Sequence, residues 1–418
     1  MNLRHLVLGV VCAAAFSASA FADTTVTLLH VSEDKTTQAL WGEIARDYEA
    51  AHPGVKVEVK YLENEAFKAK LPTMLQSDDS RPNLIYSWGG GVMEAQAKAG
   101  FLKDVGADVA GVEANMAPTA VDSIKVDGKA VGVPFDQGVV SFFYNKKLFE
   151  KAGVKAEDIK SWDDFLAAVK TLKAAGIIPI SVGAGEKWPM HFYYSYLVMR
   201  IGGEHALTDA KAGKDGGFKS ATFVEAGKRL RELAALEPFQ PGYLTTKHAE
   251  STGIFGDGKA AIELMGEWLI GMQAPNSASG KGQPEEDIGV FSFPIVAGGK
   301  GKATDTLGGV NGFLVTKTAP KEAVDFLTFF SQEKYAKAAA EKGAYIPAYK
   351  GSDAWVKDPL VKQVAAELAA TTYHQNFFDQ DLGPSVGRVI NDVSVAVAAG
   401  QMTPEAAAAS IQDAWDQQ

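Results

Sequence analysis

The chain has 418 residues, of which 46% are hydrophobic and 22% are charged, a composition typical of a soluble globular protein long enough for two domains. Its 51 acidic and 41 basic residues give a formal net charge of −10, which argues against binding to nucleic acid or to an anionic membrane surface. The seven histidines are scattered without metal-ligand spacing and Cys12 is the one cysteine, so neither a metal nor another cofactor is predicted.

The first 22 residues have the features of a secretory signal peptide. Arg4 gives a basic start, residues 6–16 form an apolar run too short to span a bilayer, and Ala20-Phe21-Ala22 supplies the small residues that precede a cleavage site. We therefore expect an exported mature chain that begins at Asp23 and contains no cysteine. A lipoprotein built on Cys12 is the weaker alternative, because a valine precedes the cysteine and the apolar run continues past it.

The first part of the mature chain alternates strands and helices. Residues 26–31 are a largely apolar strand candidate, 36–51 have apolar residues at helical spacing, and 55–61 alternate at the period of a strand. A second helix is predicted over 65–76 and a third strand over 84–88. This order predicts a parallel sheet with right-handed crossovers.

A second α/β unit is predicted to begin near residue 138. An extended segment, 131–138, leads into a strand over 139–144, and Ser161 with Asp164 forms a capping box at the start of the next helix. The remaining predicted elements are a helix end at Gly176, strands over 177–182, 260–264, 288–293 and 310–315, a surface stretch over 297–306, and a largely helical, alanine-rich region from 361 onward.

Several sequence blocks, taken in order, resemble one family over nearly the whole mature chain. The blocks are HPGVKVEV, SDDSRPNLIYSW, AGFLKDV, VGVPFDQG, YNKKLFEKAGV, SWDDFLAAVKTLK, GKAAIELMGEW, GGVNGFLV and FLTFFSQEKYAKAAAEKGAYIPA. Their joint order is similar to that of the extracellular solute-binding proteins of ABC importers, in particular the maltose-binding-protein-like sugar-binding group.

The resemblance implies an α/β fold of two lobes, the type II periplasmic binding protein fold. Each lobe would be a mainly parallel sheet flanked by helices, and hinge crossovers would let the lobes close on a ligand. After a signal peptide at 1–22, lobe I would comprise 23–133 and 303–345, and lobe II would comprise 134–302 and 346–418.

The resemblance also implies a function without catalysis. The protein would be periplasmic and monomeric, bind a neutral carbohydrate, and deliver it to the permease subunits of an ABC transporter in the inner membrane. Two alternatives stay open: a receptor for a sugar- or glycerol-phosphate, which would need basic residues at the cleft, and an exported glycoside hydrolase using carboxylates such as Glu33, Asp136 and Glu267.

Ligands of open α/β sheets bind beyond the carboxyl ends of the strands, and this position selects a candidate site. Carboxylates and amides can pair with sugar hydroxyls, and aromatic faces can stack on sugar rings. The candidates are His30, Glu33, Asp34, Trp88, Gly89, Phe135, Asp136, Gln137, Trp188, Glu267, Trp268, Gly309, Asn311 and, from the family pattern, Asp379.

Structural roles compete with binding for several candidates. Glu33 and Asp34 could cap the helix that follows them, and His30 could be a core histidine. Gly89 begins a run of three glycines that could bind an anion, admit a sugar to the backbone or form a tight turn. Asn311 could brace a strand end.

Overall fold

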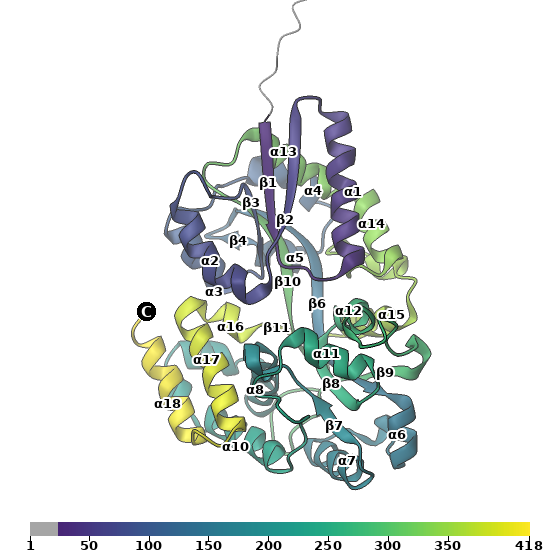
Figure 1. Cartoon of the computed structure of the whole chain (residues 1–418). Helices are drawn as coiled ribbons and strands as arrows, with labels where there is room; N and C mark the ends of the chain where they lie inside the picture. Colours follow the sequence, from purple (N-terminus) through teal and green to yellow (C-terminus); the bar gives the residue numbers. More distant parts are fainter. Residues whose placement is uncertain (1–23) are drawn as a thin grey trace, which may run out of the picture.

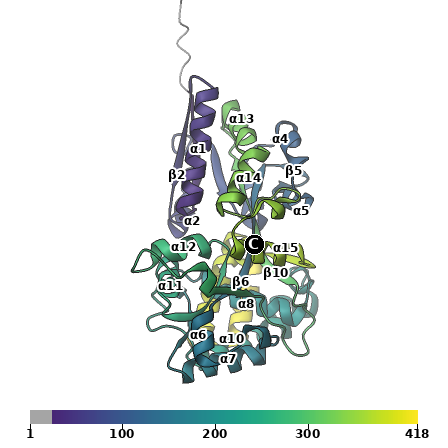
Figure 2. The same ribbon diagram turned by 90° about the vertical axis from the view of Figure 1, so that its right-hand side faces the viewer.

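The computed structural model describes residues 24–418, so the predicted signal peptide and Cys12 lie outside the described residues. The described chain forms two lobes, one above the other in Figure 1, and long strands pass between them (Figures 1 and 2). Within residues 24–418, no helix is both long and apolar enough to cross a bilayer.

Strands and helices alternate along the chain. The strands are β1 (Thr24–His30), β2 (Val55–Tyr61), β3 (Leu84–Ser87), β4 (Lys125–Val126), β5 (Lys129–Ala130), β6 (Gly132–Asn145), β7 (Ile178–Ser181), β8 (Ala260–Gly266), β9 (Ile288–Phe291), β10 (Asp305–Val315) and β11 (Tyr373–Asn376). The helices of the first half are α1 (Lys35–Ala51), α2 (Asn64–Gln76), α3 (Gly90–Lys98), α4 (Gly106–Glu113), α5 (Pro118–Ser123), α6 (Lys146–Ala152), α7 (Trp162–Ala174), α8 (Trp188–Gly202) and α9 (Ala206–Lys211).

The helices of the second half complete both lobes. They are α10 (Ala221–Ala235), α11 (His248–Gly256), α12 (Leu269–Asn276), α13 (Lys321–Phe330), α14 (Glu333–Lys342), α15 (Pro359–Ala369), α16 (Phe378–Asp381), α17 (Gly383–Ala398) and α18 (Pro404–Trp415). Short 3₁₀ helices span Ala156–Asp158, Ala184–Glu186, Lys214–Lys219, Glu285–Asp287 and Ser352–Trp355.

Strands β6 and β10 run through both lobes. They pair antiparallel, and β10 also pairs antiparallel with β3 of the upper lobe, while β6 pairs antiparallel with β8 and β9 of the lower lobe. The predicted parallel pairs are the outer ones, β1 with β2 and β3, and β7 with β8. The sheet is therefore mixed, and its two crossing strands join the lobes.

Each lobe has its own apolar core. One core draws on residues between 26 and 135 and between 310 and 349, and we call this part lobe I. The other draws mainly on residues between 139 and 307 and between 356 and 411, and we call this part lobe II. The domain boundaries expected at 134, 303 and 346 stay a prediction.

Local sequence signals explain several elements. The Ser161–Asp164 capping box is present at the start of α7, as predicted. Helix α8 is buried all round from Trp188 to Arg200, as expected for an apolar helix inside a domain. The expected strand over 310–315 is longer and begins at Asp305, inside the segment interpreted as a surface stretch. The predicted helical region after residue 361 also contains β11, a short polar strand paired with β10.

Candidate functional site

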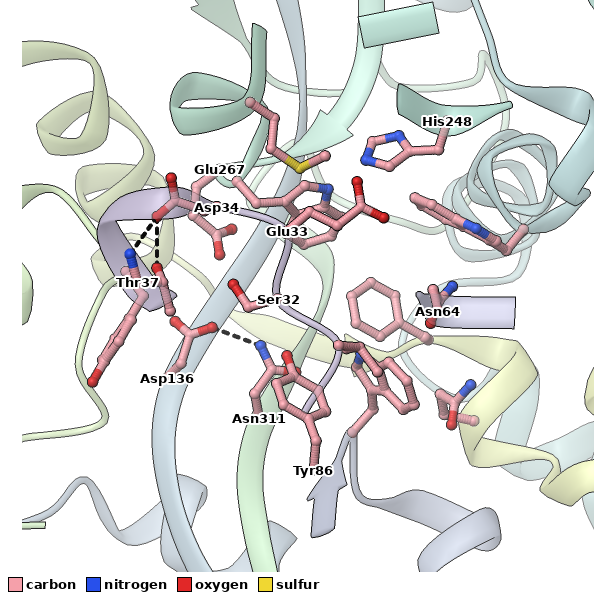
Figure 3. A pocket seen from close by; sticks show the side chains of 18 of the residues that line it. Ser32, Glu33, Asp34, Thr37, Asn64, Tyr86, Asp136, His248, Glu267 and Asn311 are labelled. Carbon is pink, nitrogen blue, oxygen red and sulfur yellow. Dashed lines mark hydrogen bonds between the residues drawn. The ribbon is translucent and has the colours of Figure 1, made fainter. Parts of the chain in front are cut away.

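The two lobes enclose a cavity of about 150 Å³ beside the crossing strands (Figure 3). This is room for on the order of ten water molecules. The lining residues are Val31, Ser32, Glu33, Asp34, Thr37, Trp41, Asn64, Lys68, Tyr86, Trp88, Phe135, Asp136, Trp188, His191, Phe192, His248, Glu267, Trp268, Met272, Asn311, Ala344, Tyr345, Phe377, Asp379 and Gln380.

Most of the predicted site residues lie in the wall of this cavity. They are Glu33, Asp34, Trp88, Phe135, Asp136, Trp188, Glu267, Trp268, Asn311 and Asp379. They come from both lobes and from both crossing strands, so the cavity is formed only where the lobes meet.

Four predicted residues lie outside the cavity wall: His30, Gly89, Gln137 and Gly309. His30 is 2% exposed and packs edge-on against Trp41 in the core of lobe I, with 4.9 Å between ring centroids. Gln137 belongs to β6, and its backbone N–H donates to the Ile346 carbonyl at 3.0 Å. Gly309 leaves room for a neighbour, because a Cβ at this position would stand 2.5 Å from the ring of Phe377.

The glycine run at 89–91 makes a turn and a close contact between lobes. Gly89 has φ +68°, which favours glycine, and it precedes α3. A Cβ on Gly91 would stand 2.7 Å from the carbonyl oxygen of Asp381. The run lets α3 of lobe I approach the backbone of α16, and it lies outside the cavity wall.

A β-bulge turns two neighbouring residues of β6 toward the cavity. Asn311 pairs with Asp136 but Gly312 pairs with Pro134, so Phe135 is the extra residue. A regular strand would point Phe135 and Asp136 to opposite faces of the sheet. With the bulge, both side chains line the cavity.

Asp136 and Glu267 are buried carboxyl groups at the hinge end of the cavity. The Asn311 Nδ2 donates to Asp136 Oδ2 at 2.6 Å, as Figure 3 shows, and the Val139 N–H donates to Glu267 Oε2 at 3.0 Å. Burial raises the pKa of Asp136 to about 7. Burial and the charge of Asp136 raise the pKa of Glu267 well above its usual value. A proton held by one of the two carboxyls limits their mutual repulsion at neutral pH.

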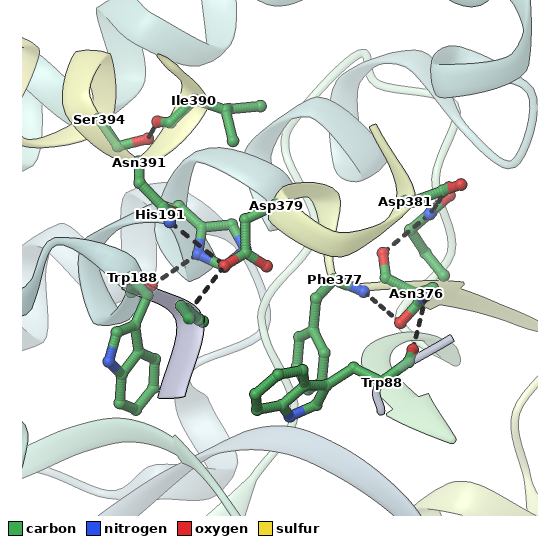
Figure 4. A network of polar contacts seen from close by, with 12 residues as sticks. Trp88, Trp188, His191, Asn376, Phe377, Asp379, Asp381, Ile390, Asn391 and Ser394 are labelled. Carbon is green, nitrogen blue, oxygen red and sulfur yellow. Dashed lines mark hydrogen bonds and ion pairs between the residues drawn. The ribbon is translucent and has the colours of Figure 1, made fainter. Parts of the chain in front are cut away.

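Lys68 and Asp379 form an ion pair across the lobes at the other end of the cavity. The Lys68 ammonium, on α2, lies 3.6 Å from Asp379 Oδ2, on α16, and 5.6 Å from the Trp88 ring centroid. Asn391 Nδ2 donates to the same Asp379 oxygen at 3.2 Å (Figure 4). Burial alone would raise the pKa of Asp379, but the charge of Lys68 and the hydrogen bond from Asn391 lower it below its usual value, so the carboxylate stays ionised.

His191 is a neutral acceptor in this network. Its Nδ1 lies 2.6 Å from the Trp188 carbonyl oxygen and therefore holds the hydrogen. Burial lowers the pKa of His191, although Asp379 opposes the shift. The Nε2 atom lies 3.8 Å from Asp379 Oδ1 and has no hydrogen-bond partner within residues 24–418, so it is left as an acceptor in the cavity wall.

Aromatic side chains form much of the remaining wall. Trp188 packs edge-on against His248, with 4.8 Å between ring centroids, and Trp268 lies 6.4 Å from Phe377. Trp88 is partly exposed and packs against the cores of both lobes. Phe377 and Gln380, close to Asp379 in the chain, also belong to the wall.

The loop after β1 combines the two roles that the sequence left open. Asp34 caps α1, since its Oδ1 accepts from the N–H and the hydroxyl of Thr37, each at 2.7 Å. Asp34 also lines the cavity, as does Glu33. Burial raises the pKa of the Glu33 carboxyl.

Several lining residues were not predicted as site residues. They are Val31, Thr37, Trp41, Asn64, Lys68, Tyr86, His191, Phe192, His248, Met272, Ala344 and Tyr345. Asn64 and Lys68 lie four residues apart on one face of α2, and His191 lies one helical turn after Trp188. The sequence shows these spacings, but it does not show which face of each helix meets the other lobe. Within residues 24–418, no three His, Cys, Asp or Glu side chains are grouped to hold a metal ion.

Comparisons with known proteins agree with this fold. An ABC transporter extracellular-binding protein of Pyrococcus horikoshii is 26% identical over 356 residues, which cover 82% of this chain and 76% of the relative. The multiple sugar-binding protein of Streptococcus mutans is 23% identical and aligns over 87% of this chain and 84% of its own.

Solved structures show the same two-lobed architecture. A chitin oligosaccharide binding protein superposes with a TM-score of 0.84 at 26% identity, covering 94% of this chain and 98% of its own. A structure from work on xylan utilization by Caldanaerobius polysaccharolyticus superposes with a TM-score of 0.85 at 25% identity, covering 93% and 99%. Residues 31–337, more than half of the chain, match one family, and the protein belongs to the bacterial extracellular solute-binding proteins.

Proposed function

We propose that this protein is the carbohydrate receptor of an ABC importer. It binds a neutral or weakly charged saccharide between its lobes, closes on it and presents it to the permease subunits in the inner membrane. The observation that carries the proposal is the cavity between the lobes, whose wall combines aromatic rings with carboxyl and amide groups.

The free polar atoms of the cavity are mostly acceptors. Asn64 Oδ1, Asp136 Oδ1, Asn311 Oδ1 and His191 Nε2 line the cavity without a hydrogen-bond partner in the described chain, beside two unpaired donors, the indole N–H groups of Trp41 and Trp188. Unpaired buried acceptors are costly, so the ligand should supply several donors. Sugar hydroxyls do so, and the flanking tryptophan rings suit the apolar face of a sugar ring.

The same inventory disfavours a sugar phosphate. Of the cavity-lining residues within 24–418, Lys68 is the single lysine or arginine, and it already pairs with Asp379. A phosphate brings only acceptor oxygens and a double negative charge. Placed beside five carboxyl groups, it would be repelled rather than bound.

A hydrolase is also disfavoured. The carboxyls at the hinge end are held by protein donors, Asp136 by Asn311 and Glu267 by Val139. The family is one of solute binding. Recovery of a bound sugar in intact form would separate binding from hydrolysis, which needs an acid and a base or nucleophile on either side of the bond.

Hinge closure follows from the arrangement of the lining residues. The wall takes residues from α2 of lobe I, from α8, α12 and α16 of lobe II, and from the crossing strands. A ligand that contacts both lobes gains these contacts only in the closed state, so it shifts the equilibrium toward closure. The sugar-binding names of the relatives in Streptococcus mutans and of the chitin oligosaccharide receptor support the same ligand class.

The proposal includes export and assembly. The protein is made with a signal peptide cut after Ala22, works in the periplasm as a monomer, and has the importer permease as its protein partner. The membership in an extracellular family and the signal-like first 22 residues support this.

A thermal-shift screen of the chain from Asp23 onward tests the function. The panel holds neutral mono-, di- and oligosaccharides, sugar phosphates, amino acids and polyamines. A micromolar ligand at millimolar concentration would stabilise the native state by about 4 kcal/mol. A shift with a saccharide that is recovered unchanged supports the proposal, and a shift only with phosphorylated or non-sugar compounds overturns it.

A further inference from the structure

The hinge end of the cavity is a pocket of acceptors. Asp136, Asn311 and Glu267 are 5%, 5% and 6% exposed and line the cavity together. Asp136 and Asn311 come from the paired strands β6 and β10, and Glu267 follows β8. Figure 3 shows Asp136 and Asn311 side by side on the crossing strands.

The carboxyl groups of the cavity outnumber its cations. The lining acids are Glu33, Asp34, Asp136, Glu267 and Asp379. Asp379 is paired with Lys68, and this leaves four carboxyls without a cation among the lining residues of the described chain. Burial lowers the pKa of His248 to about 3 and also lowers that of His191, so the two lining histidines are neutral.

Hydrogen bonding within the protein leaves acceptors free at this end. The Asn311 amide donates to Asp136 Oδ2, so its oxygen is the atom left for a ligand. Asp136 Oδ1 and Asn311 Oδ1 have no partner within residues 24–418. A donor placed between them would meet a carboxylate oxygen and an amide oxygen.

Aromatic rings surround the same point. The charge of Asp136 contributes to the raised pKa of both Tyr86 and Tyr345, so both phenols lie within its electrostatic reach. Phe135 packs against both rings, with centroids at 5.7 and 5.2 Å. Aromatic faces attract cations, and carboxylates beside them strengthen that preference.

A cation would change the energetics of the carboxyl pair. Two buried carboxylates without a counter-charge repel each other, and this favours a proton on one of them in the empty cavity. A neutral hydroxyl ligand leaves that penalty in place. A positively charged donor compensates both carboxylates and supplies hydrogens to the free oxygens.

We propose that the preferred carbohydrate is an amino sugar, whose protonated amine binds at the hinge end between Asp136, Glu267 and the Asn311 carbonyl oxygen. This inference rests on the proposed carbohydrate function and specifies its substrate class. The sugar ring lies against the tryptophan-lined remainder of the cavity.

Isothermal titration calorimetry with matched ligand pairs tests the inference. Glucosamine is compared with glucose and N-acetylglucosamine, galactosamine with galactose, and a chitosan disaccharide with cellobiose. Measurements at about pH 7.5 keep most of the amine protonated, since comparable amino groups titrate near 8, and leave Asp136, whose pKa burial raises to about 7, largely ionised. We expect the amine of at least one pair to bind tenfold or more tightly than its neutral partners.

Variants test whether the hinge end causes the preference for amines over neutral sugars. Asp136→Asn, which keeps the side-chain shape, should weaken amine binding at least tenfold more than it weakens binding of the neutral partner. Asp163→Asn is the matched control, because Asp163 is exposed on α7 and lies outside the cavity wall, and it should leave both affinities unchanged. Thermal melts of each variant establish that it is folded, and the comparison of ligands on the unsubstituted protein does not depend on any variant.

The outcomes separate this inference from the function on which it rests. Equal affinity for amine and neutral partner, or an equal loss of both in Asp136→Asn, overturns the amino-sugar inference and leaves carbohydrate binding in place. Binding of polyamines or choline without any sugar overturns both. Tighter binding of neutral sugars than of their amines also contradicts the inference.

Discussion

Asp34 of lobe I and Gly271 of lobe II meet across the cleft. Asp34 caps α1, Gly271 lies in α12, and a Cβ on Gly271 would stand 2.6 Å from Asp34 Oδ2. Such an approach is closer than a real Cβ contact allows, so only glycine admits this contact. At this point the observed arrangement of the lobes depends on the absence of one methyl group.

Gly271→Ala should therefore hinder closure without weakening either lobe. Alanine is favoured over glycine in a helix by about 1 kcal/mol, so the melting temperature without ligand should stay level or rise. Ligand affinity should fall about tenfold, because about 1.4 kcal/mol of closure energy is lost. Titration calorimetry and small-angle scattering with saturating ligand measure both effects.

Gly42→Ala is the matched control for this substitution. Gly42 lies in α1, and a Cβ there would meet only the end of Arg46, at 3.5 Å. Gly42→Ala should stabilise its helix to a similar extent and leave the ligand affinity unchanged. Unaltered affinity and compaction in Gly271→Ala would show that the contact between Asp34 and Gly271 does not limit closure.

Trp88 and Trp268 are expected to bind ligand rather than to hold the fold. Both are partly exposed and line the cavity. Trp88→Ala and Trp268→Ala should each weaken binding by about 1–3 kcal/mol, measured by calorimetry, with little change in the melting temperature. A melted protein would instead mean that the two rings are core residues.

Trp162→Ala provides the contrasting control. Trp162 is 1% exposed, stacks on Phe293 with 5.5 Å between centroids and lies outside the cavity wall. Removing a buried tryptophan costs about 3–5 kcal/mol of folding free energy. Its loss should lower the melting temperature strongly while any protein that remains folded keeps its affinity.

The periodicity of the sequence predicted most outer elements because their buried faces repeat at regular spacing. Strand β2 spans the predicted residues 55–61, and α1 begins one residue before its predicted start. An extended segment over 131–138 and a strand over 139–144 were predicted, and the structure joins them in the crossing strand β6, which begins at Gly132. Pro134 and Gly138 resemble loop residues, and only pairing with β10 over the bulge reveals the strand.

The candidate site was predictable where residues follow strands and less so on helices. Trp88 and Trp268 follow from the rule that ligands lie beyond strand ends, because they come just after β3 and β8. Lys68 and His191 lie on helix faces whose direction depends on how the lobes pack. Gly309 was expected at the ligand and instead makes room for Phe377, a relation between strands that no local pattern contains.

Glu263 should make the stability of the protein depend on pH. It is fully buried on β8, with the hydroxyls of Ser251, Thr252 and Ser181 at 3.0, 3.3 and 3.3 Å, and burial raises its pKa to about 8. The folded state keeps a proton between about pH 4.5 and 8 that the unfolded state releases. The free energy of unfolding should therefore fall as pH rises through this window.

Glu263→Gln isolates this contribution. Glutamine keeps the size and the hydrogen bonds but does not titrate, so the stability of the variant relative to the unsubstituted protein should increase from pH 5 to pH 9 by a few kcal/mol. Chemical denaturation at pH 5, 7 and 9 measures the difference. Glu150→Gln, at an exposed position, should leave the pH profile unchanged. If the difference in the free energy of unfolding between Glu263→Gln and the unsubstituted protein does not change with pH, Glu263 does not hold the proton.

The ion pair between Lys68 and Asp379 should favour the closed state. Its two residues lie on opposite lobes, and Asp379 is 7% exposed, so closure without the lysine would bury an unpaired carboxylate. Lys68→Met keeps the apolar stem over Trp88 and removes the charge. We expect ligand affinity to fall by about 1–3 kcal/mol at pH 7, measured by calorimetry, because Lys68 is partly exposed and water screens part of the loss.

The pH dependence of Lys68→Met distinguishes this effect from lost packing. Lys68 helps to hold the pKa of Asp379 below its usual value, so removing Lys68 raises that pKa. Asp379 in the variant then takes up a proton as the pH falls toward 5, and the affinity difference should shrink. Asp379→Asn added to Lys68→Met should likewise restore part of the affinity at pH 7. Lys70→Met, at an exposed position of the same helix, should leave the ligand affinity unchanged. If the loss of affinity in Lys68→Met is the same from pH 5 to pH 7, it comes from lost packing alone.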